Sequence, residues 1–235
     1  MSPLKDREKK RIDFRGKLYL APLTTVGNLP FRRLCVSMGA EITCGEMVLA
    51  SHLLRGDRPE WALTRRHSSE KIFGVQLAGH RPEVLMRTAE ILEREFNVDF
   101  IDINSGCPID SVFNSGAGSA LMDASSRVRR MITGITRVVD CPVTIKMRMG
   151  VLDNKPMAHK FVSKLEEWGC SLMTVYCLFL KYIRQLPDRF MVDHERNGIR
   201  DLPIGITYDN AKKNPAQCRF TVTEMSCPGQ IIISI

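Results

Sequence analysis

The chain has 235 residues, 44% of them hydrophobic and 26% charged, so it can bury the core of one α/β domain or of two small ones. Its net charge of +8 indicates a polyanionic partner, most commonly nucleic acid, although solubility alone explains the same excess. No apolar run reaches the roughly 20 residues of a transmembrane helix, which excludes that class of membrane protein.

The eight cysteines form no C-x-x-C pair and have no metal-ligand spacing. We therefore expect reduced thiols and no metal site in the chain. The N-terminus is charged rather than apolar, which predicts a chain without a secretory leader. Together these features predict a cytoplasmic protein, or a nuclear one.

Residues 1–17 are polar and basic and predict a surface lead-in, either a solvated tail or an arm that contacts nucleic acid. From residue 18 onward, short apolar runs alternate with amphipathic segments. The apolar runs predict strands over residues 18–21, 40–47, 71–77, 99–103, 142–147 and 171–175. Helical spacing and early prolines predict helices over residues 30–38, 82–96, 125–139 and 156–168, with residues 60–70 helix or loop.

Alternating strands and helices, with connections long enough for crossovers, predict a parallel sheet. Two architectures fit: an open doubly wound sheet and a (β/α)8 barrel. No G-x-G-x-x-G opens the first helix, which weakens the dinucleotide-binding version of the open sheet. The barrel is favoured because unusual residues lie near the carboxyl ends of the predicted strands, where a barrel gathers its active site: Pro22, Glu46, Gln76, Asn104 and Lys146.

The turn after the strand at 99–103 carries a polar side chain and a thiol together. It reads Asn104-Ser105-Gly106-Cys107-Pro108, in which glycine permits a close backbone approach and proline fixes the exit. A lone cysteine is usually an inert buried hydrophobe, and the other seven receive that interpretation. For Cys107 the flanking Gly106 and Pro108 predict an exposed turn instead, and we interpret this turn as an active site.

Two further polar residues interrupt apolar strands. Lys146 stands inside 142–147, where a buried ammonium is costly without an anion, so a phosphate, a carboxylate or an electron-rich ring is its expected partner. The alternative is a solvent-facing edge residue. Gln76 lies between Val75 and Leu77, where an amide can hold a heterocycle by paired hydrogen bonds or can tie down a loop.

Five segments of the chain together resemble the flavin-dependent tRNA-dihydrouridine synthases, most closely the eukaryotic branch that modifies the variable loop. They are 21–23 (Ala-Pro-Leu), 75–77 (Val-Gln-Leu), 102–108 (Asp-Ile-Asn-Ser-Gly-Cys-Pro), 116–122 (Gly-Ala-Gly-Ser-Ala-Leu-Met) and 144–148 (Thr-Ile-Lys-Met-Arg). The N-x-G-C-P turn is the most specific of them, and the five follow the order of the family.

The resemblance implies an FMN-binding (β/α)8 barrel in which NADPH reduces the flavin. Reduced FMN passes a hydride to C6 of a uracil flipped out of the tRNA, and a cysteine protonates C5. By match, Cys107 is the proton donor, and Gln76, Asn104 and Lys146 contact the flavin ring. Pro22 and Leu23 border the isoalloxazine. The implied partner is tRNA, and candidate phosphate contacts are Arg32, Arg33, Arg65, Arg66, Arg129 and Arg130, although solvated surface is the favoured interpretation of each one taken singly.

The resemblance covers residues 18–175, a partial barrel domain with about six of eight strands. Residues 176–235 form a divergent tail in which the family's flavin-binding His-Gly-Arg turn, helical domain and zinc fingers are not found. We expect no further strand in residues 187–230, an open sheet edge, and an aggregation hazard in the β-prone run at 231–235. Residues 176–183 are apolar enough to form a helix that covers the gap. The break suggests an alternative transcript or a mispredicted gene end.

Two other functions stay open at this point. The chain could be a truncated product that binds RNA without catalysis, or does not fold fully. It could also be another FMN barrel oxidoreductase that acts on a small pyrimidine.

Overall fold

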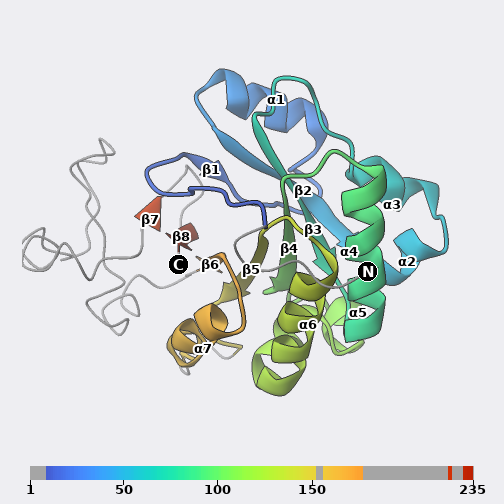
Figure 1. The fold of residues 1–235 in the computed structure, drawn as a ribbon, viewed down its shortest axis with the longest axis vertical. Coiled ribbons are helices and arrows are strands. Elements are labelled where there is room, and N and C mark those ends of the chain that lie inside the picture. The colour runs from blue at the N-terminus through green and yellow to red at the C-terminus, as the bar shows by residue number, and fades with distance from the viewer. Residues whose placement is uncertain (1–8, 152–155, 177–221, 224–229, 235) are drawn as a thin grey trace, which may run out of the picture.

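The computed structural model describes residues 9–151, 156–176, 222–223 and 230–234. Its centre is one sheet in which six strands run parallel in the order of the sequence (Figure 1). They are β1 (Tyr19–Leu20), β2 (Ile42–Leu49), β3 (Ile72–Ala78), β4 (Phe100–Ser105), β5 (Val143–Arg148) and β6 (Leu172–Tyr176). The six predicted strands are confirmed, and each end differs from the prediction by one or two residues.

Helices alternate with the strands and pack on the outer face of the sheet (Figure 1). The longest are α1 (Leu29–Ser37), α4 (Pro82–Glu95) and α6 (Ser125–Val138), all predicted. The helix predicted over 156–168 is instead a 3-10 turn, η3 (Ala158–Lys160), followed by α7 (Val162–Glu167). The remaining helices are too short to show a periodicity: α2 (Ala50–Leu54), α3 (Arg58–Leu63), α5 (Asp110–Phe113) and η2 (Gly118–Asp123).

The two faces of the sheet carry different side chains, because residues alternate along each strand. On β4, Ile101 and Ile103 belong to the main apolar core between sheet and helices. Phe100 points to the inner face and joins a second apolar cluster. Asp102 and Asn104 follow it on that face toward the carboxyl end, and both are buried. The inner face is therefore apolar at the amino ends of the strands and polar at their carboxyl ends.

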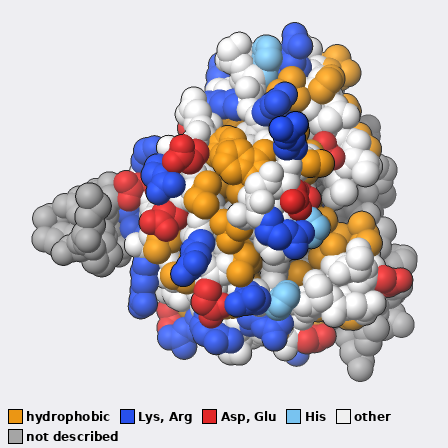
Figure 2. All heavy atoms as spheres, turned by 90° about the vertical axis from the view of Figure 1, so that its right-hand side faces the viewer, with side chains coloured by type: hydrophobic (Ala, Val, Ile, Leu, Met, Phe, Trp, Pro, Cys, Tyr) orange, Lys and Arg blue, Asp and Glu red, His pale blue; other side chains and the backbone are white. Residues whose placement is uncertain are grey.

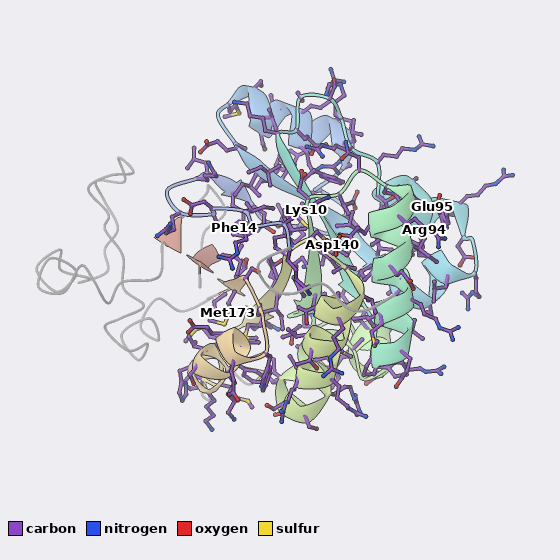
Figure 3. The ribbon with its side chains drawn as sticks, in the orientation of Figure 1. Lys10, Phe14, Arg94, Glu95, Asp140 and Met173 are labelled. Atoms are coloured by element: carbon purple, nitrogen blue, oxygen red, sulfur yellow. The ribbon has the colours of Figure 1, made fainter. Side chains whose placement is uncertain are left out.

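The basic lead-in is not wholly solvated, and in that respect the prediction for residues 1–17 is wrong. Phe14 is buried and meets the ring of Phe100 edge-on, with 5.9 Å between ring centroids. The backbone amide of Lys10 donates to the carbonyl of Asp140, which fixes the segment across the amino ends of the strands (Figure 3). Phe14 thus closes the apolar end of the inner face.

The sheet continues beyond β6 with two strands of opposite direction. β8 (Gln230–Ser234) pairs antiparallel with β6, and β7 (Val222–Thr223) pairs antiparallel with β8. The expectation of an open edge at β6 is wrong, and so is the expectation that residues 187–230 hold no strand. The β-prone run at 231–235 falls in β8 up to Ser234, so its backbone pairs with β6. Residues 177–183, predicted as a covering helix, lie outside the described residues.

The protein is thus an α/β chain with six parallel strands of an incomplete (β/α)8 barrel, as predicted. None of its described helices is both long and apolar enough to span a bilayer. Within the same described ranges, no group of three or more His, Cys, Asp or Glu side chains has the arrangement of a metal site.

Candidate active site

Three of the predicted site residues meet at the carboxyl ends of neighbouring strands. Gln76 comes from β3, Asn104 from β4 and Lys146 from β5. Asn104 and Lys146 are register partners across the β4–β5 pair. Gln76 Oε1 accepts a hydrogen bond of 2.9 Å from Asn104 Nδ2. The sheet therefore places two amides and an ammonium on one face, as the sequence predicted.

Asn104 also connects these amides to the loop that holds Cys107. Its Oδ1 accepts from the backbone amide of Cys107 at 2.9 Å and from that of Gly106 at 3.2 Å. The carbonyl of Cys107 in turn accepts from the amide of Ser119 at 2.9 Å. The turn is therefore held from both sides, by β4 and by η2.

The Cys107 side chain is more enclosed than predicted. Only 9% of the residue is exposed, and it packs with Val112, Ala117 and Met47. The prediction of an exposed turn holds for Pro108, whereas the thiol itself is buried. Gly118 makes this packing possible, because its φ of +58° favours glycine and a Cβ there would collide with the Cys107 carbonyl.

Lys146 is half-buried, and its charge is set by its neighbours. Burial lowers the pKa of Lys146, while the negative charge of Asp102 acts in the opposite direction. Cys107 also interacts with the Lys146 ammonium electrostatically. Lys146 thus lies between the Cys107 loop and the carboxylate of Asp102.

Asp102 is a site residue that the sequence interpretation missed. Its carboxylate is buried and accepts from Gln76 Nε2 at 2.7 Å and from Thr144 Oγ1 at 2.6 Å. Burial raises the pKa of Asp102 to about 6. The signal was present in the sequence, since Asp102, like Lys146, is a charged residue inside an apolar strand.

Pro22 and Leu23 lie at the carboxyl end of β1, as expected, and begin the loop that follows it. Pro22 is buried and Leu23 is half-buried. The loop is tied to the end of β2, because Glu46 Oε2 accepts from the backbone amide of Thr25 at 2.8 Å. This hydrogen bond connects the loop to β2. The Gln76 and Asn104 amides lie on the next two strands of the sheet, β3 and β4.

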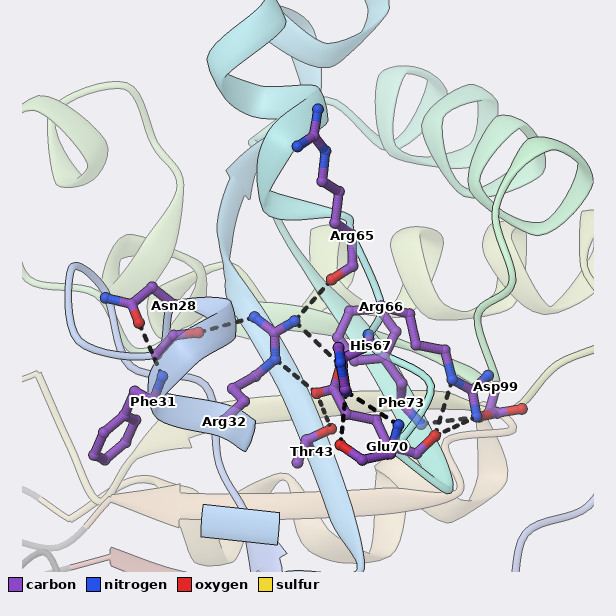
Figure 4. Close-up of polar contacts among 12 residues, drawn as sticks. Asn28, Phe31, Arg32, Thr43, Arg65, Arg66, His67, Glu70, Phe73 and Asp99 are labelled. Atoms are coloured by element: carbon purple, nitrogen blue, oxygen red, sulfur yellow. Dashed lines mark hydrogen bonds and ion pairs between the residues drawn. The ribbon is translucent and has the colours of Figure 1, made fainter. Parts of the chain in front are cut away.

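Two arginines proposed as nucleic-acid contacts are structural instead. Arg32 is 2% exposed, and its Nε lies 2.8 Å from Glu70 Oε1 (Figure 4). The same guanidinium donates to the carbonyls of Gly27 and Arg65. Arg66 donates to the backbone carbonyl of Glu70. It also forms an ion pair of 3.0 Å with Asp99, the residue just before β4. Neither side chain is free for a phosphate. The exposed candidates are Arg33, Arg65, Arg129 and Arg130.

Basic side chains are nevertheless widespread on the surface. Figure 2 shows the side of the molecule that lies at the right of Figure 1, where Lys and Arg side chains, interspersed with Asp and Glu, surround a group of apolar side chains. The chain as a whole carries 34 Lys and Arg against 26 Asp and Glu. This excess suits a polyanion.

A parallel half-barrel with polar side chains and a thiol at the carboxyl ends of its strands has the organisation of a barrel enzyme. The sequence profile of the dihydrouridine synthase family (Dus) matches residues 19–180. The chain belongs to the dihydrouridine synthase family, which the sequence motifs predicted. Proteins named as members of this family are oxidoreductases.

Individual relatives are identical to this chain at about half of the aligned positions. The chain is 52% identical over 178 residues to the tRNA-dihydrouridine(47) synthase [NAD(P)(+)] of Coprinopsis cinerea, covering 74% of this chain and 26% of the relative. It is 51% identical over 173 residues to the human tRNA-dihydrouridine(47) synthase [NAD(P)(+)]-like protein, covering 74% and 27%. The rice protein of the same name is 54% identical over 170 residues, covering 72% and 25%. The chain thus spans about a quarter of the length of these relatives.

Proposed function

We propose that this chain carries the catalytic residues of a tRNA-dihydrouridine synthase, which reduces a tRNA uridine to dihydrouridine with FMN as cofactor and NADPH as reductant. One observation supports this proposal above the others. Gln76, Asn104 and the Cys107 loop form a continuous hydrogen-bonded chain, beside Lys146, at the carboxyl ends of β3, β4 and β5. The relatives are named for the same reaction and for NAD(P).

The residues present fit the ring of FMN. Its pyrimidine edge offers alternating acceptors and donors, which the Gln76 and Asn104 amides and the Lys146 ammonium can match. The buried hydroxyl of Thr174, the register partner of Lys146 on β6, has no hydrogen-bond partner among the described residues. An unmatched buried hydroxyl in this layer is consistent with a ligand there. Pro22 and Leu23 would border the ring from β1.

When bound, reduced FMN supplies a hydride to C6 of the uracil. Cys107 then has the complementary role, because its Sγ–H donates the proton to C5 and the C5=C6 bond becomes a single bond. The proton leaves a thiolate, which regains a proton from solvent. Lys146 stabilises negative charge on its neighbours, and Asn104 holds the Cys107 loop in place.

The uridine must leave the base stack of the tRNA to reach this site. The positive net charge of +8 favours the RNA backbone. Arg33, Arg65, Arg129 and Arg130 remain candidate phosphate contacts because they are exposed. A tRNA substrate also fits the predicted cytoplasmic or nuclear location. We keep residues 18–175 as the proposed catalytic part and residues 176–235 as the tail.

The test is dihydrouridine formation by the full 235-residue chain. Wild type, Cys107→Ala and Cys35→Ala would be incubated with unmodified tRNA, FMN and NADPH, and dihydrouridine would be counted by mass spectrometry. Cys35 is a buried cysteine on α1, away from the site, and serves as the matched control. We expect Cys107→Ala to lower the rate by about 10² to 10⁴-fold with FMN binding retained, and Cys35→Ala to match wild type.

Three results would contradict the proposal. Equal rates for wild type and Cys107→Ala would remove the proton-donor role. Reduction of free uracil without any need for tRNA would favour a small-pyrimidine oxidoreductase. Binding of tRNA by a colourless protein with no product would favour an RNA-binding chain without catalysis.

A further inference from the structure

The carboxylate of Asp102 occupies the centre of the polar layer. Its two register partners are Gln76 on β3 and Thr144 on β5, and it accepts a hydrogen bond from each. The exposed fraction of Asp102 is 0%. The side chain is therefore closed off from solvent, and its hydrogen-bonded neighbours carry its influence on the site.

An ionised carboxylate only accepts hydrogen bonds, and this fixes the direction of the amides around it. Gln76 must turn its Nε2 toward Asp102, which leaves Oε1 to accept from Asn104 Nδ2. Asn104 must then turn its Oδ1 toward the amides of Gly106 and Cys107. One carboxylate thus sets the orientation of both amides and, through them, the position of the Cys107 loop.

The same carboxylate lies on the face of the sheet that carries Lys146, two register positions away across the β4–β5 pair. Asp102 favours the charged form of Lys146 against the burial that lowers the pKa of that lysine. The titratable groups that interact with Lys146 come from four segments: Cys44 on β2, Asp102 on β4, Cys107 in the loop after β4, and Arg148 on β5. Burial raises the pKa of the Cys44 thiol, so Cys44 is neutral at ordinary pH. Asp102 is the carboxylate of this group.

The burial of Asp102 disfavours its charged form. The second buried carboxylate among the described residues, Glu70, faces the Arg32 guanidinium at 2.8 Å, and its pKa lies below the ordinary value. The pKa of Asp102 is raised instead, mainly by burial. A neutral side chain of the same shape would therefore suit the folded state better. A buried carboxylate that accepts hydrogen bonds at the centre of a polar layer, and whose charge is disfavoured there, indicates a role in binding rather than in folding.

We propose that Asp102 is a positioning residue for the ring-binding groups: its carboxylate fixes the Gln76 and Asn104 amides in one orientation and keeps Lys146 positively charged. This inference rests on the proposed function, because it takes these three groups as those that contact the cofactor ring. It adds to that function a residue that touches neither substrate nor cofactor.

Two variants of the full chain separate the two effects. Asp102→Asn removes the charge but keeps both hydrogen bonds, since its Oδ1 can accept from Gln76 and its Nδ2 can donate to the Thr144 hydroxyl. Asp102→Ala removes the hydrogen bonds as well. Asp99→Asn is the matched control, because Asp99 stands just before β4 and accepts from the Phe73 amide and pairs with Arg66.

The first measurements use the protein without flavin, so they do not depend on cofactor binding. In a ¹³C NMR titration of labelled lysines, we expect the pKa of Lys146 to fall by about 1 or more in Asp102→Asn and to stay unchanged in Asp99→Asn. In ¹⁵N–¹H spectra, we expect the Gln76 side-chain amide to keep two separate signals in Asp102→Asn and to lose them to exchange in Asp102→Ala.

The second measurements are FMN affinity and urea unfolding. We expect Asp102→Asn to weaken FMN binding by about tenfold with an unfolding midpoint equal to or above wild type. The control variant, Asp99→Asn, should show the reverse: a lower midpoint of urea unfolding and an FMN affinity equal to that of wild type. A merely structural Asp102 would lower the midpoint and the affinity together, which would overturn the proposal. An unchanged Lys146 pKa and unchanged Gln76 signals in both variants would overturn it too.

The two proposals can fail separately. If wild type binds no FMN, the proposed function fails, while the Lys146 and Gln76 measurements still decide whether Asp102 positions these groups. If wild type binds FMN and all Asp102 variants bind it equally well, the positioning role fails and the proposed function stands.

Discussion

The side-chain oxygen of Asn104 accepts a hydrogen bond of 2.9 Å from the backbone amide of Cys107, three residues further along the chain. The same side chain donates to Gln76 on the neighbouring strand. Asn104 therefore joins the amide cluster to the loop that holds the thiol, and the two halves of the proposed site share one residue.

This relationship predicts that Asn104→Ala loosens the Cys107 loop. Without the acceptor, two backbone amides lose their partner, and the thiol becomes accessible more often. We expect iodoacetamide to modify Cys107 several-fold faster in the variant, measured by peptide mass spectrometry. Cys170, which is buried between α7 and β6 with a pKa raised to about 12, is the internal control and should be unchanged. An unchanged rate at Cys107 would contradict the role of Asn104.

The loop also depends on glycine at position 118. Gly118 has a φ of +58°, and a Cβ there would meet the Cys107 carbonyl and, at 2.9 Å, Val112 Cγ1. Gly56 is the matched control, since its φ of +84° is equally unusual but nothing lies within 4 Å of its Cβ position. We expect Gly56→Ala to cost about 1 kcal/mol of unfolding free energy, and Gly118→Ala to cost about 2 kcal/mol more. Equal losses in urea unfolding would show that the Cys107 loop adapts freely.

Arg32 and Glu70 predict a strong effect on stability at acidic pH. Although burial acts to raise it, the pKa of Glu70 is held below its ordinary value by Arg32, the His67 amide and Thr43. The stability this provides is present above pH 4.5 and is lost as pH falls through the lowered pKa. We expect Glu70→Gln to cost about 3 to 5 kcal/mol at pH 7 and to flatten the loss of stability in acid.

The exposed pair of Asp13 and Arg15 is the control for that measurement, because both side chains are more than 60% exposed. Asp13→Asn should leave the acid limb of the unfolding curve as in wild type. If Glu70→Gln had no larger effect than Asp13→Asn, the buried pair would not hold the loops around it.

Asp102 predicts a pH dependence of the opposite sign. Its pKa is raised from 3.8 to about 6, so the folded state binds the proton more tightly than the unfolded state does. Its contribution to the unfolding free energy therefore falls as pH rises from about 4 to about 6. The stability of Asp102→Asn relative to wild type should rise over that interval in urea unfolding. A difference that stays constant with pH would contradict the raised pKa.

Local patterns in the sequence predicted the parallel strands and the position of the main site residues. Gln76, Asn104 and Lys146 stood out because each is polar at the carboxyl end of an apolar strand, and parallel pairing brings such positions together. Asp102 is likewise a charged residue inside an apolar strand, and this signal was overlooked beside the more conspicuous Asn104 and Cys107.

Features that depend on distant pairing could not be predicted. Arg32 and Glu70 lie 38 residues apart, and neither position alone indicates that the other neutralises it. Phe14 and Ile12 are isolated apolar residues in a basic segment, so the burial of Phe14 against Phe100 left no periodic signal. The antiparallel strand β8 joins β6 across a long stretch of chain, and no local pattern specifies such a partner.

The central claim is that Gln76, Asn104 and Lys146 form a binding site for the ring of FMN. The most direct measurement is a fluorescence titration of FMN into the full chain, with Lys146→Met compared with Lys160→Met, an exposed lysine in η3. The account predicts saturable binding by wild type and by Lys160→Met, and binding at least about tenfold weaker in Lys146→Met. Equal affinities for the two lysine variants, or no saturable binding by wild type, would contradict it.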